Sequence, residues 1–239
     1  EARMFLDIND KGKPVNKDLI WDLTGALDPG TPEGIVSNAV KEFVKDTNTN
    51  NIFYNQIKVP SEVTKGKFSF GGFCRTLYDD CNITRKEVKR KTEINGNESD
   101  VSIRNPFYSQ NYTTMTSNIF KGFNSFFTNL NSRLKEEKRD AIYNDAVVAI
   151  FSQLAMEYFK FHKKRTIVED GKTNFFDCIA NFINEMNNEE ISIVKKQSNS
   201  QQKALQLAEF TRVIKEEYDP EFGIIPKSQL VKDVELFCN

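Results

Sequence analysis

The stretch 115-MTSNIFKGFNSFFTNLNSRL-134 decides the fold class, because apolar residues recur in it every three or four positions. That spacing places them along one face of an α-helix. Four of them are phenylalanines, whose rings bury a large apolar area. The stretch therefore predicts a long amphipathic helix with one face in a hydrophobic core. The apolar positions are Met115, Ile119, Phe120, Phe123, Phe126, Phe127, Leu130 and Leu134.

The same periodicity extends toward the C-terminus. Apolar stripes at helical spacing lie at 147–159 and 175–186, and Asn144 is a candidate N-cap for the first of them. Further helices are expected at about 200–218 and 227–238. Stripes of this kind usually form a core rather than a cofactor site. The chain has twenty phenylalanines, which explains how a polar sequence can still build that core.

Shorter helices are expected in the first half of the chain. An apolar stripe is already present at 1–10, and a polar turn follows it. Helices are then expected after the N-capping residues Asn16 and Thr31, and from about Ser69. Pro32 suits the first helical position. The first of these helices carries Leu19, Ile20, Leu23 and Leu27 on one face.

Two segments depart from the helical pattern. The β-rich run 51-NIFYNQIKVP-60 predicts a short strand from Ile52 to Val59. The segment 82–100 has few apolar and many charged residues, so we expect a mobile excursion there. The predicted fold class is therefore mainly α, with one short β element.

Composition and charge limit the classes of protein to which this chain could belong. The chain of 239 residues is 38% hydrophobic and 28% charged, which is typical of a globular protein. Its formal net charge is −1, so a nucleic-acid-binding surface would have to be a local patch. No apolar run is long enough to span a membrane. We expect a cytoplasmic protein.

Signatures of cofactor and metal enzymes are absent from the sequence. The four cysteines form no CxxC pair and there is one histidine, so no zinc site can be assembled and free thiols are expected. His162 lies next to lysines near the expected end of a helix. No serine or cysteine motif that could supply a nucleophile accompanies it. No phosphate-binding glycine loop and no GxSxG are present. We therefore assign no catalytic residue, no metal and no cofactor.

The first hundred residues resemble the DGQHR-domain family, which includes DndB-like proteins of DNA phosphorothioation clusters. The resemblance extends more weakly through "NPFY" and "AIYNDAVVAIFSQLA", to about residue 155. It implies a ParB-related protein of DNA modification, phage defence or transcription regulation. Four motifs carry it, in order: "EARMFLDINDKGKPVNKDLI", "EGIVSNAVKEF", "FYNQIKVP" and "FSFGGFCRTL".

In this family the opening helix closes a ParB-like α/β domain, and the Asp-Gly-Gln-His-Arg motif lies upstream of it. This chain lacks that pentapeptide. The resemblance thus implies that Glu1 is not the biological start and that an upstream ParB-like segment is a partner. It also implies a boundary between 1–105, the end of that region with its helical extension, and a helical domain at 106–239. The alternative is a diverged protein with a natural start nearby.

The resemblance does not imply a nucleotide-binding or metal-binding site on the opening helix. ParB-like domains place an acidic residue directly before an Asn there, and that pair serves nucleotide and metal binding. Here Ile8 precedes Asn9, and the nearest acids are Asp7 and Asp10. A carboxylate two positions away points elsewhere on a helix.

The densest positive stretch is 84-TRKEVKRK-91, in which only Glu87 opposes the cations. Lysine and arginine bind DNA by neutralising phosphates and releasing counterions. Arg75, on the expected short helix, is a separate candidate. The candidate DNA-binding residues are Arg75, Arg85, Lys86, Lys89, Arg90 and Lys91. The alternatives are a solvated loop for the cluster and a structural ion pair for Arg75.

Three functions remain open at this point. The first is a DndB-like DNA-binding or regulatory protein. The second is an enzyme that uses nucleotides or processes DNA, with its active site upstream. The third is a helical protein-interaction module, and a homo-oligomer is compatible with each. The basic cluster and the resemblance favour the first over the third.

Overall fold

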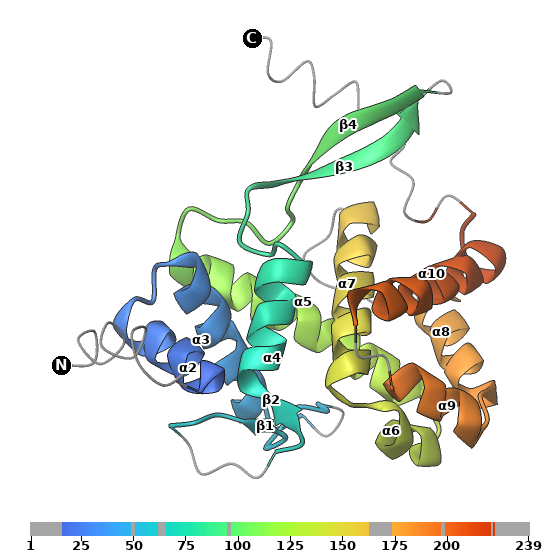
Figure 1. Ribbon diagram of the computed structural model, residues 1–239, viewed down its shortest axis with the longest axis horizontal. Helices are drawn as coiled ribbons and strands as arrows, with labels where there is room; N and C mark the ends of the chain where they lie inside the picture. Colours follow the sequence, from blue (N-terminus) through green and yellow to red (C-terminus); the bar gives the residue numbers. More distant parts are fainter. Residues whose placement is uncertain are drawn as a thin grey trace.

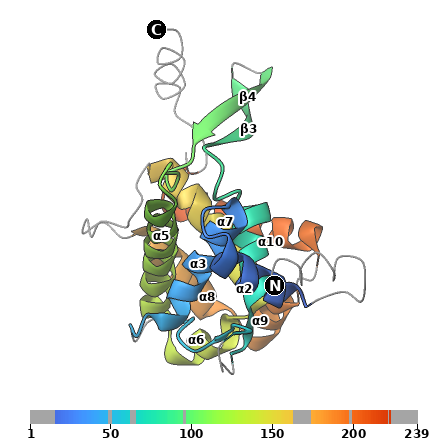
Figure 2. The ribbon, with the colours of Figure 1, turned by 90° about the vertical axis from the view of Figure 1, so that its left-hand side faces the viewer.

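The computed structural model describes residues 16–48, 51–61, 66–94, 97–162, 174–196, 199–220 and 222. Within them the protein is mainly α-helical, which confirms the predicted fold class. Figures 1 and 2 show a body of packed helices, with a hairpin of two strands, β3 and β4, standing away from it at one end. The helices expected at 1–10 and 227–238 lie outside the described residues.

The first two described helices begin where the capping signals predict. Helix α2 (Lys17–Leu27) starts with the Asn16 side chain accepting a hydrogen bond from the Asp18 N–H at 2.9 Å. Helix α3 (Pro32–Lys45) starts with the Thr31 hydroxyl accepting from the Gly34 N–H at 3.1 Å. These side chains satisfy N–H groups that have no partner within the helix.

Helix α2 does not turn its apolar stripe to the core, contrary to what the stripe predicts. The buried residues of α2 are Asp22 and Gly25, whereas Ile20 and Leu27 are exposed. The Lys41 ammonium lies 2.6 Å from the Asp22 carboxylate, and the Ser61 N–H donates to that carboxylate at 2.7 Å. Partners distant in the sequence thus turn the polar face of α2 inward.

The strand predicted at 52–59 is wrong for most of its length. Residues 52–56 form turns, and only β1 (Ile57–Lys58) pairs, in parallel, with β2 (Phe68–Ser69). Asn55 has φ 53°, a left-handed conformation that interrupts an extended run. The buried Asn51 stabilises this bend by donating to the Phe43 carbonyl at 2.8 Å and accepting from the Phe53 N–H at 2.9 Å.

The short helix predicted from Ser69 is confirmed. Helix α4 (Phe70–Arg75) is capped by the Ser69 hydroxyl, which accepts from the Gly72 N–H at 3.0 Å. A π-helical turn, η1 (Thr76–Asp80), continues it. The chain then passes through turns at 81–86 into the hairpin.

Most described residues of 82–100, where a mobile excursion is expected, form β structure instead. Strands β3 (Glu87–Ile94) and β4 (Asn97–Arg104) pair antiparallel along their whole length, from Glu87 opposite Arg104 to Ile94 opposite Asn97. The described residues therefore hold two small sheets, whereas the sequence pattern predicts one β element. Asn95-Gly96 separates the strands in the sequence, and this dipeptide strongly favours two-residue hairpins.

The second half of the chain is helical, as predicted. The long helix α5 (Tyr112–Arg133) leads to α6 (Glu136–Ile142) and then to α7 (Asp145–His162), which Asn144 caps by accepting from the Val147 N–H at 3.0 Å. The remaining described helices are α8 (Asn174–Glu185), α9 (Asn188–Lys195) and α10 (Ser200–Glu217). None of the described helices is long and apolar enough to cross a bilayer.

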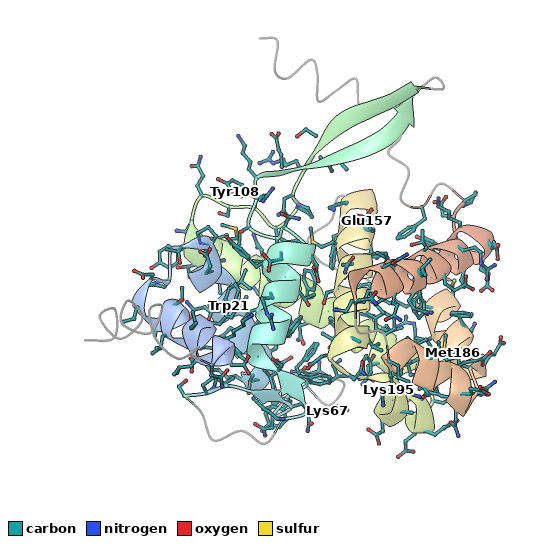
Figure 3. The ribbon with its side chains drawn as sticks, in the orientation of Figure 1. Trp21, Lys67, Tyr108, Glu157, Met186 and Lys195 are labelled. Atoms are coloured by element: carbon teal, nitrogen blue, oxygen red, sulfur yellow. The ribbon has the colours of Figure 1, made fainter. Side chains whose placement is uncertain are left out.

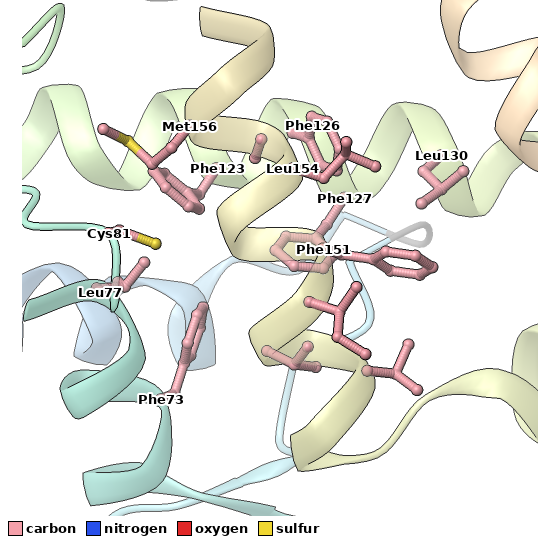
Figure 4. Close-up of a cluster of buried hydrophobic side chains, with 14 of the residues drawn as sticks. Phe73, Leu77, Cys81, Phe123, Phe126, Phe127, Leu130, Phe151, Leu154 and Met156 are labelled. Atoms are coloured by element: carbon pink, nitrogen blue, oxygen red, sulfur yellow. The ribbon is translucent and has the colours of Figure 1, made fainter. Parts of the chain in front are cut away.

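The core forms where α4, α5 and α7 meet, and phenylalanines dominate it (Figure 4). The Phe53 ring stacks on Phe73 at 4.9 Å between ring centroids and meets Phe127 edge-on at 4.9 Å. These three rings come from the turn after α3, from α4 and from α5. Most residues of the predicted stripes of α5, α7 and α8 are buried, and Phe120, Tyr158 and Phe182 are partly buried and pack against the core, so the assignment of these stripes to the core is confirmed.

Candidate nucleic-acid interface

Five of the six candidate DNA-binding residues lie at one place, where the chain enters the hairpin. Arg85 and Lys86 are exposed residues of the turn before β3, and Lys89, Arg90 and Lys91 belong to β3 itself. The expected mobile loop is thus replaced by a turn and a hydrogen-bonded strand. We call these five residues, Arg85, Lys86, Lys89, Arg90 and Lys91, the basic foot.

Asn105 fastens the basic foot to the helical body. Its buried side chain donates to the carbonyl of Ile83 at 2.6 Å and to that of Arg85 at 2.9 Å. Its side-chain oxygen accepts from the Phe107 N–H at 2.9 Å, and its own N–H donates to the Lys86 carbonyl at 2.9 Å. One residue therefore holds the incoming and outgoing strands together.

Phe107 extends this attachment into the core. It is fully buried, and its ring lies 5.0 Å from Phe159 of α7 and 5.5 Å from Phe123 of α5. The hairpin thus starts from a fixed base although its strands stand away from the body (Figure 1). No expectation from the sequence included the anchoring role of Asn105 and Phe107. The Asn-Pro dipeptide at 105–106, a turn signal, was the available clue.

Charge is distributed unevenly along the hairpin. Residues 85–91 contain five cations and one acid, whereas residues 92–100 contain three acids and no cation. In the ladder Lys89 lies opposite Ser102 and Arg90 opposite Val101, so neither faces an acid across the sheet. Farther out, Lys91 lies opposite Asp100 and Glu93 opposite Glu98. The end near the body is therefore positive and the far end negative.

Residues 85–91 contain a single acid, Glu87, among the five cations of the basic foot. The Ser102 hydroxyl donates to its carboxylate at 2.6 Å, and Arg104 lies opposite it in the ladder. Glu87 therefore has a hydrogen-bond partner within the hairpin.

Arg75, the sixth candidate, lies on a different element. It is the exposed last residue of α4, and its Nε donates to the Gly71 carbonyl one turn earlier at 3.2 Å. Among the described residues it makes no ion pair, so the alternative of a structural ion pair receives no support. The π-helical turn η1 and residues 81–84 separate it in sequence from the basic foot.

An open pocket of about 340 Å³ adjoins the basic foot. Arg85 lines it on one side, together with Thr84, Asn82 and Asp79. Tyr78 also lines it, and a hydrogen bond to the Glu33 side chain, together with burial, raises the pKa of that phenol. Because Asp79 shares the pocket, Arg85 has a carboxylate nearby.

Trp21 and Tyr78 connect this region to α2. Their rings meet edge-on at 5.7 Å between centroids, and Trp21 lies on the side of α2 that faces α4 (Figure 3). The contact fixes the Tyr78 wall of the pocket against the helical body. It gives that wall a structural role independent of any ligand.

The cysteines offer no reactive centre among the described residues. Cys74, Cys81 and Cys178 are free and buried, as expected. Burial raises the pKa of all three thiols, that of Cys178 to about 12, so they stay protonated at neutral pH. The part of the chain that the structure describes holds no group of histidine, cysteine and acidic side chains that could bind a metal.

Comparison with known proteins does not identify a family for this chain. No protein-family model, no curated protein and no solved structure matches this chain.

Proposed function

We propose that this protein binds DNA through the basic foot of the β3–β4 hairpin. The observation that carries the proposal is the concentration of five cations in residues 85–91 of a chain whose net charge is −1. They lie at the base of a hairpin that stands away from the body (Figure 1). Nucleic-acid binding by a near-neutral protein requires such a local patch.

The shape of the hairpin suits a duplex. A two-stranded ribbon fits the major groove of B-DNA. Each strand has eight residues, or about 26 Å at 3.3 Å per residue. The acids at 92–100 would be repelled by phosphates, so we expect the basic foot, and not the far end, to meet the backbone. Contacts of this type give affinity without base recognition.

We further propose a DndB-like regulatory role in DNA modification or phage defence, in the cytoplasm. The support is the resemblance of the first 155 residues to DGQHR-domain proteins, together with the basic foot. Three buried, free thiols are compatible with a reducing compartment. Arg75 remains a candidate contact because its exposed guanidinium has no ion-pair partner among the described residues.

The proposal is tested by fluorescence anisotropy with a labelled duplex at about 50 mM salt, where electrostatic binding is strong. The variant replaces Lys86, Lys89, Arg90 and Lys91 with Ala, and we expect it to lose most of the affinity. The matched control removes four exposed lysines away from the hairpin: Lys17, Lys58, Lys121 and Lys196. It should bind nearly as well as the unmodified protein. Equal losses in the two variants would mean that only total charge matters.

A further inference from the structure

The pocket beside the basic foot has a wall of unusual backbone. Residues 76–80 form the π-helical turn η1, and the Cys81 N–H donates to the Thr76 carbonyl at 2.9 Å. Asn82 follows with φ 49°, a left-handed conformation. π-helical turns and left-handed residues other than glycine are uncommon in proteins and recur at functional sites. Both features occur here on the same side of one pocket, so this wall is a candidate ligand site.

Buried side chains hold this wall in place. Cys81 and Ile83 are buried in the core, whereas Asn82 and Thr84, which alternate with them, line the pocket. The Asn82 side chain donates to the Asp79 carbonyl at 3.1 Å and closes the turn. The pocket therefore has a shape that exists before any ligand binds, as small-molecule sites usually do.

The pocket offers both a charged acceptor and a charged donor. The Asp79 carboxylate and the Arg85 guanidinium line it, and within the described ranges neither belongs to an ion pair. The Thr84 hydroxyl adds a smaller polar group, and Pro32 and the Tyr78 ring add apolar surface. A ligand that suits this lining has a flat apolar body with N–H donors on one edge and acceptor atoms on another.

A guanine base has this pattern. Its N1–H and N2–H groups point the same way and match the two oxygens of a carboxylate, whereas its O6 and N7 atoms accept from a guanidinium. Cytosine, adenine and thymine each lack that pair of adjacent donor groups. Bases also stack on aromatic side chains such as Tyr78. The pocket volume of about 340 Å³ lies at the lower end of the range for small-molecule sites, which suits a single base.

The position of the pocket favours DNA as the source of that base. Arg85 belongs both to the pocket and to the basic foot, and Lys86 is the next residue. A phosphate bound by these cations has its own nucleotide beside the pocket. A base within a duplex is stacked and paired, so only an unpaired or extruded base can enter.

We propose that the pocket receives one unpaired guanine base of the DNA that the basic foot holds. Asp79 accepts from the N1–H and N2–H groups of the base, and Arg85 donates to O6 and N7. The inference rests on the proposed DNA binding and adds recognition of one base to it. Phosphate contacts alone give no preference among bases, so any preference for guanine comes from the pocket.

Fluorescence anisotropy with three labelled duplexes tests the pocket: one fully paired, one with a single unpaired guanine and one with a single unpaired thymine. The unmodified protein should bind the guanine duplex at least about fivefold more tightly than the other two, the low end for a bidentate contact to a base. Asp79→Asn should abolish this preference, because a carboxamide replaces one of the two acceptor oxygens with a donor. Asp80→Asn, the same charge change at the neighbouring exposed acid outside the pocket lining, is the matched control and should keep it.

Three results would overturn the proposal. They are equal affinity for the guanine and thymine duplexes, a guanine preference that Asp79→Asn keeps, and a preference that Asp80→Asn also abolishes. Equal affinity for all three duplexes that still depends on the basic foot would leave the proposed DNA binding intact. Failure to bind any of the three would contradict both the pocket and the DNA binding.

Discussion

The Asn105 side chain donates a hydrogen bond to the main-chain carbonyl of Arg85 at 2.9 Å. This bond joins the residue after β4 to the first cation of the basic foot. It explains how a charged hairpin with few apolar residues can start from a fixed base. A two-stranded hairpin alone is only marginally stable in water, so its attachment to the body matters.

Asn105→Ala should destabilise the protein. The change leaves the carbonyls of Ile83 and Arg85 and the Phe107 N–H without their partner in a buried site, which costs about 1–3 kcal/mol. Urea unfolding would measure the loss. Asn118→Ala is the matched control, because Asn118 makes only a 3.5 Å hydrogen bond to the Phe107 carbonyl. Similar losses for both variants would show that Asn105 is not a special anchor.

Asp22→Asn should destabilise the protein at neutral pH by about 3 kcal/mol, because it breaks the ion pair with Lys41. This value is at the low end for a buried ion pair, since the Lys41 side chain is 15% exposed to solvent. Burial acts to raise the pKa of Asp22, but hydrogen bonds from Lys41 and Ser61 outweigh it and lower the pKa below 3.8. A lowered pKa means that the charge stabilises the fold above that range and ceases to do so as pH falls through it.

The stability difference between the unmodified protein and Asp22→Asn should therefore shrink below pH 3.8, as the native carboxylate becomes protonated. Unfolding free energies at pH 7 and pH 3 would measure it. A difference that stays constant across this range would mean that the Asp22 charge contributes nothing.

Glu98→Lys should stabilise the hairpin. Glu98 lies opposite Glu93 in the ladder, and like charges directly opposite are unfavourable, so an opposite pair should add about 0.2–1 kcal/mol. Slower amide exchange in β3 would report the gain. Glu185→Lys makes the same charge change at the end of α8 and should leave β3 exchange unaltered. Faster exchange in Glu98→Lys would contradict the register.

The helical parts of this fold could be predicted from sequence because their signals are local. Asn16, Thr31 and Asn144 cap helices within three residues of themselves, and the apolar stripes of α5 and α7 identify their own buried face. The orientation of α2 could not be predicted in this way. It depends on Lys41 and Ser61, which lie 19 and 39 residues from Asp22.

The sequence identifies the candidate residues of the site but not the hairpin that carries them. The five cations are evident from the local composition of residues 85–91. The strand that carries three of them is not evident, because its many charged residues do not resemble a typical strand sequence. Val88, Ile94, Val101 and Ile103 supply too little apolar periodicity to indicate a strand, although Asn95-Gly96 marks the hairpin. Asn105 donates to the carbonyls of Arg85 and Ile83, which lie 20 and 22 residues away in the sequence. No local sequence pattern reveals contacts over that separation.

The most direct test of DNA binding by the basic foot is a salt titration of affinity for duplex DNA. The logarithm of the binding constant should fall linearly with the logarithm of salt concentration, with a slope of about −0.9 for each phosphate neutralised. Replacing Lys86, Lys89, Arg90 and Lys91 with Ala should make that slope shallower by up to about four units if each meets a phosphate. The control that removes Lys17, Lys58, Lys121 and Lys196 should keep the original slope. Identical slopes for the unmodified protein and the basic-foot variant would contradict the account.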